Sequence, residues 1–199
     1  MGTQSPVIMG ILNLTPDSFS DGGQFDSVQS AVQAATAMVA HGAQIIDVGG
    51  ESTRPGAERI SLEVELERVI PVIEQLSSKG IYVSIDTMRA EVAKAAVDAG
   101  AQMVNDVSGG LSDPHMLTTV ARLGVPIVLM HWRGPSKTMQ ENIHYVNALT
   151  EVCAELHSMA KAAQLAGIER GNIILDPGIG FGKEAVHNWK LLQNVDTLF

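Results

Sequence analysis

Six apolar segments of this sequence each end in a polar residue whose side chain can do chemistry. These residues are Asn13, Asp47, Asp86, Asn105, His131 and Asp176. A carboxylate accepts two parallel N–H hydrogen bonds and an amide both donates and accepts, so a group of such side chains suits a flat, donor-rich heterocycle. In parallel α/β proteins, residues at the carboxyl ends of strands meet at one rim of the sheet. We therefore expect a functional site at that rim.

The segments that position these residues are short and rich in Val, Ile and Leu. They lie at about residues 7–13, 43–48, 81–86, 101–107, 125–130 and 172–176. Near-continuous apolar runs of this length predict strands that are covered on both faces of a parallel sheet. The segments between them have helical periodicity and stop at glycines, each followed within a few residues by the next strand: Gly42, Gly80, Gly100, Gly124 and Gly167. The pattern is a repeated βα unit.

Local signals predict where some of the helices begin. Asp26 and Ser27 are expected to cap the first helix, and Ser61 the second, which Pro71 should kink. Asp113, followed by proline, reads as the N-cap of a later helix.

Repeated βα units form either an open doubly wound sheet or a closed barrel, and the local pattern does not separate them. An open sheet concentrates its site where strand order reverses, whereas a barrel brings every strand end to a common mouth. Nearly every strand end here is polar, which favours a TIM (β/α)8-type barrel. Such a barrel typically needs about 250 residues. We expect a single domain over residues 1–199, truncated after about six βα units and incomplete at the C-terminus.

Composition restricts the class of protein and its partners. The 199 residues are 45 % hydrophobic, enough for a substantial core. The formal net charge of −9 and the lack of a Lys/Arg cluster argue against a nucleic-acid partner. Cys153 is the only cysteine, and neither a secretory leader nor a membrane-length apolar stretch is visible, so the expected location is the cytoplasm, without a membrane partner.

Two connections after predicted strands are candidates for binding loops. Residues 13–23 are dense in hydrogen-bonding groups, which is typical of a loop over a site, although a solvated turn is the alternative. Residues 49–56 combine glycines with Thr53 and Arg54, whose donors suit an anion or a carboxylate. The alternative there is a turn with a surface arginine.

The connection at residues 176–183 contains three glycines and ends in Lys183, but it fits neither of the common phosphate motifs. Glu184 stands where Ser or Thr should follow the lysine of a P-loop, and Pro177 stands at its first glycine. The dinucleotide motif fails because Lys183 occupies its last glycine position. The remaining interpretation of this segment is a flexible loop that follows the carboxylate of Asp176.

Asp86, Asn105 and Asp176 end three different strands, so on a barrel they would converge in one pocket. The alternative is that each caps the helix that follows it, since Asp and Asn are strongly preferred N-cap residues. His131 is a further candidate for lining the mouth. The histidines show no spacing typical of a zinc site.

The motifs of this sequence resemble those of the dihydropteroate synthase family, enzymes of the folate pathway that join a pterin to para-aminobenzoate. The resemblance runs almost end to end, in the segments 9–23, 47–56, 84–87, 104–106, 129–131 and 175–183. It implies a TIM-barrel fold, and it implies that diphosphate leaves the pterin substrate first, so that the aromatic amine attacks the resulting cation.

The resemblance also implies roles for individual residues. Asp86, Asn105 and Asp176 would hold the pterin ring, with Met130 packing against it. Asn13 would bind Mg²⁺, the only cofactor implied, together with the diphosphate.

A second group of residues would border the aminobenzoate. These residues are Phe19, Thr53, Arg54, Pro55 and Phe181, of which Thr53 and Arg54 are assigned to the catalytic group.

The sequence departs from the family pattern at its end. Family members continue into a seventh strand with a Ser-Arg-Lys motif and an eighth with Arg-x-His. We therefore expect the 199-residue chain to be inactive or nearly so, and its two unpaired strand edges to cause aggregation or reliance on a partner chain. A homodimer is expected only at full length.

Two other functions remain open at this stage. One is a pterin-binding methyltransferase domain of the corrinoid-dependent kind, and the other is a non-catalytic fragment that only binds pterin. The loops at residues 15–19 and 52–56 favour the synthase.

Overall fold

The computed structural model describes residues 6–14, 24–52, 59–134 and 143–197. Four residues assigned to the aminobenzoate by resemblance lie outside this range: Phe19, Thr53, Arg54 and Pro55.

Strands and helices alternate along the described chain. The strands are β1 (Met9–Asn13), β2 (Ile45–Gly49), β3 (Val83–Asp86), β4 (Met103–Asp106), β5 (Ile127–Met130) and β6 (Ile173–Asp176). The helices are α1 (Gln24–Ala40), α2 (Leu62–Ser78), α3 (Ala90–Asp98), α4 (Met116–Leu123), α5 (Ala148–Leu165) and α6 (Ala185–Gln193), with short 3-10 helices η3 (Arg170–Asn172) and η4 (Val195–Thr197). The six predicted strands are confirmed, each somewhat shorter than its apolar run.

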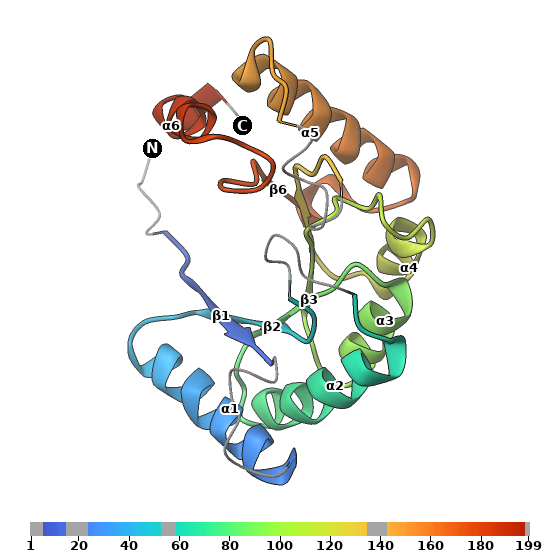
Figure 1. The fold of residues 1–199 in the computed structure, drawn as a ribbon. Helices are drawn as coiled ribbons and strands as arrows, with labels where there is room; N and C mark the ends of the chain where they lie inside the picture. Colours follow the sequence, from blue (N-terminus) through green and yellow to red (C-terminus); the bar gives the residue numbers. More distant parts are fainter. Residues whose placement is uncertain (1–5, 15–23, 53–58, 135–142, 198–199) are drawn as a thin grey trace.

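The six strands form one parallel sheet in the order β1-β2-β3-β4-β5-β6. Figure 1 shows the helices arranged in an arc outside the strands, with β1 and α6 at the open side of that arc. Because the order never reverses, the sheet has no topological switch point, and the doubly wound alternative is excluded. The arrangement is that of a β/α barrel of six units, as the sequence predicted.

One row of side chains crosses the sheet and faces the helices. The register aligns Leu12 with Val48, Ile85, Val104 and Ile127, one from each of five neighbouring strands. All five are buried in the hydrophobic core together with the inward stripes of the helices. Side chains alternate along a strand, so the residues next to this row belong to the opposite, inner face of the barrel.

The predicted helix boundaries were partly right. Ser61 caps α2, its Oγ accepting the Val64 N–H at 3.4 Å, and α2 continues through Pro71. The expected caps at Asp26 and Ser27 are wrong, because α1 begins at Gln24.

Helix α4 begins at Met116 with His115 as its N-cap, so Asp113 lies three residues before the helix, and its Oδ1 accepts the His115 N–H at 2.8 Å. Its other oxygen, Oδ2, accepts the N–H of Ala90, the first residue of α3, at 2.8 Å. This carboxylate therefore also caps α3, whose first residue lies 23 residues before it, a long-range contact that local sequence does not encode. The prediction that the helices end at glycines is confirmed. Gly124, for example, ends α4 in a left-handed conformation, and its N–H donates to Val120 O.

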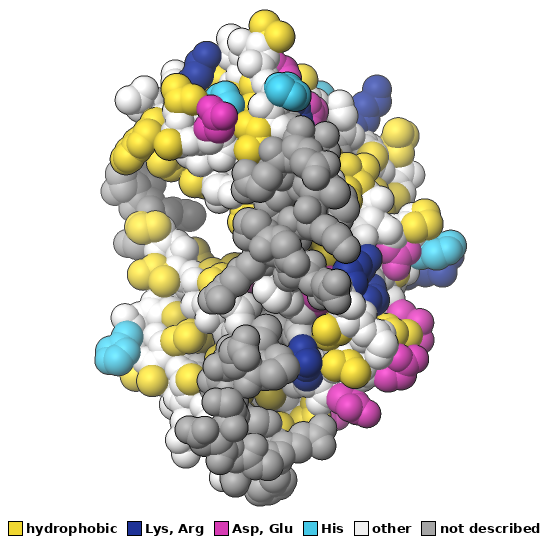
Figure 2. Space-filling model, in the orientation of Figure 1, with side chains coloured by type: hydrophobic (Ala, Val, Ile, Leu, Met, Phe, Trp, Pro, Cys, Tyr) yellow, Lys and Arg dark blue, Asp and Glu magenta, His cyan; other side chains and the backbone are white. Residues whose placement is uncertain are grey.

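The sheet ends at β1 and β6, neither of which pairs with a further strand among the described residues. Apolar side chains are exposed at both edges: Ile11 of β1 at 54 % and Ile174 of β6 at 42 %. On the face that Figure 2 shows, acidic side chains gather over the α2–α3 flank while Lys and Arg side chains are scattered. No helix in the described part of the chain has the length and apolarity to cross a bilayer.

We predict that the exposed edges drive self-association. The double variant I11K/I174K should shift the purified chain toward a monomer in sedimentation velocity, because charged residues on edge strands oppose strand pairing between molecules. The matched control is L165K, at an exposed position at the end of α5 rather than in an edge strand. A wild-type chain that is already monomeric, or an L165K variant with the same effect, would contradict this prediction.

Candidate functional site

The sheet register brings three of the predicted residues into one row on the inner face. Asn13 aligns with Gly49, Gly49 with Asp86, and Asp86 with Asn105, across four neighbouring strands. Aligned residues of parallel strands point to the same face, so the side chains of Asn13, Asp86 and Asn105 lie on the same side of the sheet.

Gly49 allows Asn13 and Asp86 to approach one another. A Cβ atom at Gly49 would lie 3.3 Å from Asp86 Oδ2 and 3.5 Å from Asn13 Oδ1, so both oxygens border the space left by the missing side chain. The side chain of Asn13 is exposed at this point and that of Asp86 is partly buried. The two oxygens can therefore face a ligand together.

Asp47 precedes Gly49 by two residues and thus shares its face. It is buried, with 2 % exposure, and its Oδ2 accepts a 2.8 Å hydrogen bond from the Asn105 amide. Burial raises the pKa of Asp47, and this hydrogen bond opposes the rise. The amide of Asn105 is therefore oriented by a second carboxylate, a role that the strand-end pattern alone did not predict.

Asp86 lies in an environment that disfavours its charge. Burial raises its pKa well above the ordinary value, and the negative charges of Asp47, Asp106, Glu65 and Glu51 raise it further. A carboxylate in such surroundings is strongly stabilised by N–H donors that hydrogen-bond to its ionised form. The electrostatics here favour a ligand rich in N–H groups.

A second group of residues lies at the ends of β5 and β6. Met130 aligns with Asp176, and Asp176 Oδ1 accepts the Gly178 N–H at 2.7 Å. A Cβ at Gly178 would lie 3.2 Å from Met130 Cγ and 2.6 Å from His131 O, so only glycine fits there, at φ 66°. Met130 is buried beside the partly buried Asp176.

The register also relates this second group to the first. Asn105 aligns with Val128, which aligns with Ile174. Met130 and Asp176 each follow these partners by two residues and so share their face. The two aspartates expected to hold the ring, on β3 and β6, thus point to the same inner side at the carboxyl ends of their strands.

His131 does not line the mouth, contrary to the sequence-based expectation. Its side chain is buried, and it lies between Lys183 Nζ, 3.0 Å from Nδ1, and Glu155 Oε2, 2.9 Å from Nε2. Burial, reinforced by the Lys183 ammonium, lowers the pKa of His131 to about 4. Burial also lowers the pKa of Lys183, to about 8. The imidazole is therefore neutral near pH 7.

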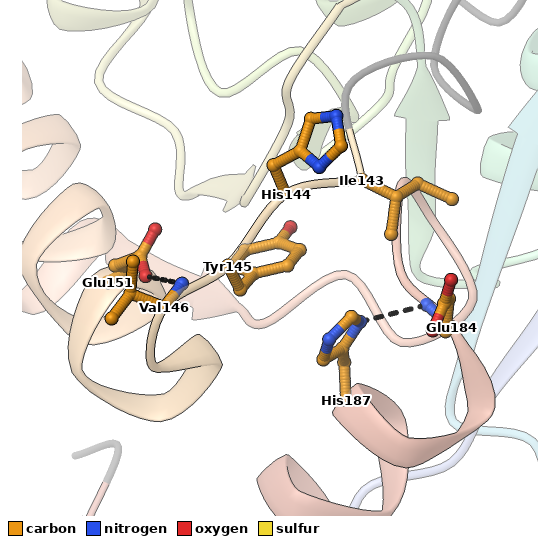
Figure 3. Close-up of a pocket in the computed structure, with 7 residues that line it drawn as sticks. All are labelled: Ile143, His144, Tyr145, Val146, Glu151, Glu184 and His187. Atoms are coloured by element: carbon orange, nitrogen blue, oxygen red, sulfur yellow. Dashed lines mark hydrogen bonds between the residues drawn. The ribbon is translucent and has the colours of Figure 1, made fainter.

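Arg133 and Tyr145 extend this cluster toward α6. Arg133 binds Glu151 and Glu155 of α5, and its Cζ lies 4.0 Å from the centre of the Tyr145 ring. Tyr145 lines a pocket of about 460 Å³ together with Ile143, His144, Val146, Glu151, Glu184 and His187. Figure 3 shows that Tyr145 stands between the start of α5 and His187 of α6.

A network of charged side chains connects the residues on either side of the segment 52–59. Thr53, Arg54 and Pro55 belong to this segment and lie outside the described residues. Glu51 Oε2 accepts the Ile60 N–H at 3.2 Å, so this carboxylate joins the two ends. Arg89 contacts Glu51 and the buried Glu65 and donates to Ile60 O.

The described residues contain no group of three or more His, Cys, Asp or Glu side chains arranged to hold a metal. A divalent ion bound at this rim would therefore take at most one or two ligands from the described residues. Mg²⁺ accepts such an arrangement, because it keeps several waters and binds substrate phosphates with only one or two protein oxygens. The exposed amide oxygen of Asn13 is one suitable oxygen.

Residues 9–199 match the model of a family described as pterin binding enzyme. The chain is 50 % identical over 192 residues to a dihydropteroate synthase of Mycobacterium leprae, covering 96 % of this chain and 68 % of that protein. A dihydropteroate synthase of Synechocystis is also 50 % identical, with 96 % and 66 % covered. The chain spans 38 % of a folate synthesis bifunctional protein of Pisum sativum, so it corresponds to about two thirds of the first two relatives and less of this one.

Solved structures give the same result. The Xanthomonas albilineans dihydropteroate synthase with 4-aminobenzoic acid superposes with a TM-score of 0.89 at 45 % identity, covering 97 % of this chain and 68 % of that one. The complex of a dihydropteroate synthase from the same organism with 7,8-dihydropteroate gives a TM-score of 0.85 at 41 % identity, covering 100 % and 70 %.

We predict that Arg89 is needed for stability because Glu65, 1 % exposed, would be left as a buried charge without it. R89M should lower the free energy of unfolding by about 3 kcal/mol, measured by urea denaturation. The loss of unfolding free energy in the double variant E65Q/R89M should be smaller than the sum of the losses in E65Q and R89M. The control K94M removes an exposed pair with Asp98 and should change stability by less than about 0.5 kcal/mol. Equal losses in R89M and K94M would contradict the network.

We predict that His131 makes the protein sensitive to acid. The unfolded chain binds a proton on this histidine below about pH 6.5, whereas the folded chain binds it only near pH 4. The free energy of unfolding should therefore fall as pH drops from 6.5 to 4, with His131 contributing up to about 3 kcal/mol of that fall. Urea titrations across this range should show a flatter profile in H131Q and an unchanged one in the control H41Q, at an exposed position. A profile of H131Q parallel to wild type would contradict the assignment.

Proposed function

Because the chain belongs to the dihydropteroate synthase family of pterin-binding enzymes, we propose that the inner rim of its sheet holds a dihydropterin diphosphate and directs its methylene carbon to para-aminobenzoate. The observation that carries the proposal is the shared face of Asp86, Asn105 and Asp176 at the ends of three parallel strands. Two of the three are carboxylates, so the rim suits the N–H-rich edge of a pterin.

The pterin is held by hydrogen bonds that favour the charged form of the aspartates. The raised pKa of Asp86 reflects burial and nearby negative charge, and ring N–H groups offset both. Asn105, oriented by Asp47, presents its amide oxygen to a further donor because its nitrogen already donates to that carboxylate. Met130 packs against the ring beside Asp176.

The reaction requires no protein nucleophile. The bond between the methylene carbon and the diphosphate oxygen breaks, both electrons leave with the diphosphate, and a resonance-stabilised cation remains on the pterin. The amine nitrogen of para-aminobenzoate then forms the new C–N bond and releases a proton. The protein positions the two reactants and places carboxylates near the positive charge that develops.

Asn13 is the proposed protein ligand on the diphosphate side. Mg²⁺, when bound, supplies positive charge that stabilises the departing diphosphate. An amide oxygen is a suitable ligand for this hard cation, and its exposed position next to Asp86 leaves room for phosphate oxygens and water.

The aminobenzoate is proposed to lie against Phe181 and the segment that carries Thr53, Arg54 and Pro55. A Xanthomonas albilineans relative was solved with 4-aminobenzoic acid, which supports this choice of substrate. Phe181 is partly buried, and its N–H is bound to Gly178 O, which fixes the backbone of the connection next to Asp176. Phe19 is proposed to complete this side.

We predict that D86N and D176N each weaken binding of 6-hydroxymethylpterin about 10- to 100-fold, because each loses a charge-assisted hydrogen bond of about 1.5–3 kcal/mol. Isothermal titration with the purified chain measures the change. D98N is the matched control, since this exposed aspartate pairs with Lys94 in α3, on the outside of the sheet.

Activity is tested by incubating the same chain with dihydropterin diphosphate, para-aminobenzoate and Mg²⁺. The dihydropteroate formed is measured by liquid chromatography. Product that depends on both substrates supports the synthase, whereas pterin binding without product supports a binding-only role. Pterin affinities of D86N and D176N equal to that of wild type would sink the proposed site.

A further inference from the structure

Lys183 is buried in the connection between β6 and α6, with 5 % exposure, and all three of its N–H donors have partners. Its Nζ lies 3.0 Å from Gly178 O, 3.0 Å from Phe181 O and 3.0 Å from His131 Nδ1. Burying an ammonium is costly unless it is fully hydrogen-bonded, so this geometry holds the ammonium and the connection together. The lysine fits no phosphate-binding motif, and its donors are used within the protein.

The imidazole of His131 joins this ammonium to α5. An ammonium has no lone pair, so Nδ1 of His131 must accept from Lys183, and the imidazole proton is therefore on Nε2. Nε2–H then donates to Glu155 Oε2 at 2.9 Å, and Glu155 is also bound by Arg133. The neutral state of His131, whose pKa is lowered to about 4, keeps Nδ1 available as an acceptor.

A second side chain holds the same connection from the other side. The Tyr145 hydroxyl donates to Gly182 O at 3.0 Å, and the ring lies between Arg133 and His187, whose ring centre is 4.9 Å away. Figure 3 shows Tyr145 and His187 beside the start of α6. Three carbonyl groups of the connection, those of Gly178, Phe181 and Gly182, are thus bound by two side chains that Arg133 and its glutamates support.

The backbone held in this way touches both proposed substrate subsites. Gly178 donates to Asp176 Oδ1 and packs against Met130, on the pterin side. Phe181 lies on the aminobenzoate side. The ammonium is also attracted by the negative charge of Asp176, which raises the pKa of Lys183 against the effect of burial.

We propose that Lys183 is a positioning residue: through three hydrogen bonds it sets the conformation of residues 177–183, and thereby the placement of Asp176 and Phe181, without touching substrate. The expected effect of Lys183 on pterin binding rests on the proposed function. The expected effect of Lys183 on the conformation of residues 177–183 does not.

The test compares K183M with K190M. Methionine is close to lysine in length but has no donors, and Lys190 of α6 makes an exposed side-chain hydrogen bond to Asn147. In K183M, the amide hydrogen exchange of Gly178 and Phe181 should speed up at least tenfold relative to the core strands, and 6-hydroxymethylpterin affinity should fall about tenfold. K190M should change neither.

Two further measurements apply if K183M does not fold. Y145F removes one hydroxyl from the other support and should speed exchange in residues 178–183 by about twofold to tenfold while the fold is kept. In the wild-type chain, the Lys183 ammonium protons should exchange with water slowly enough to be seen by nitrogen-detected NMR, unlike those of exposed lysines.

The outcomes separate the two proposals. If wild-type protein binds no pterin, the proposed function fails, and the exchange data still decide the role of Lys183. If wild type binds pterin and K183M matches it in affinity and exchange, the positioning role is overturned while the function stands. Fast-exchanging Lys183 ammonium protons in wild type would also overturn the positioning role.

Discussion

Side chains alternate between the two faces of a β-strand, and in a parallel sheet without reversals this alternation is transmitted from each strand to the next. One row, from Leu12 to Ile127, is apolar and packs under the helices. The row one residue further on carries Asn13, Asp86 and Asn105 on the opposite face. A slip of one residue in β1, β3 or β4 would turn its polar side chain toward the helices and a core residue toward the inner face. The hydrophobic core therefore fixes the register, and the register fixes which polar groups can meet a ligand.

The rim gathers negative charge in a partly buried environment, and the protein tolerates this in different ways at different positions. Asp106 is fully buried, and its oxygens accept the N–H and hydroxyl of Ser108 and the N–H of Gly110, which oppose the rise of its pKa on burial. Asp47 has the amide of Asn105. For Asp86, burial and the surrounding carboxylates are the causes of its raised pKa, and no hydrogen bond is among them. This difference makes Asp86 the position that gains most from an N–H-rich ligand.

The sequence predicted the strands, their order of appearance and the polar residues at their ends, because those features depend on local periodicity and on the chemistry of single residues. It did not predict contacts between distant segments. Asp113 reads locally as the cap of α4, yet it binds the first N–H of α3. His131 reads as a rim residue because it follows an apolar strand, yet its side chain is buried between Lys183 and the partly exposed Glu155. Both contacts join residues that are far apart in the sequence, so they depend on the packed structure. An unexplained lysine at the end of a glycine-rich loop was the only signal in the sequence for the second case.

The two connections proposed to border the aminobenzoate are anchored by the same physical means. Glu51 and Arg89 join the ends of the segment after β2, and Lys183 with His131 holds the connection after β6. Glycine-rich connections have little apolar surface with which to pack, so their conformation must come from hydrogen bonds to their backbone. A buried charge forms the strongest such bonds, and it is costly in any arrangement that leaves it unpaired. Anchoring a loop at its base with a buried charge therefore restricts that base to one conformation.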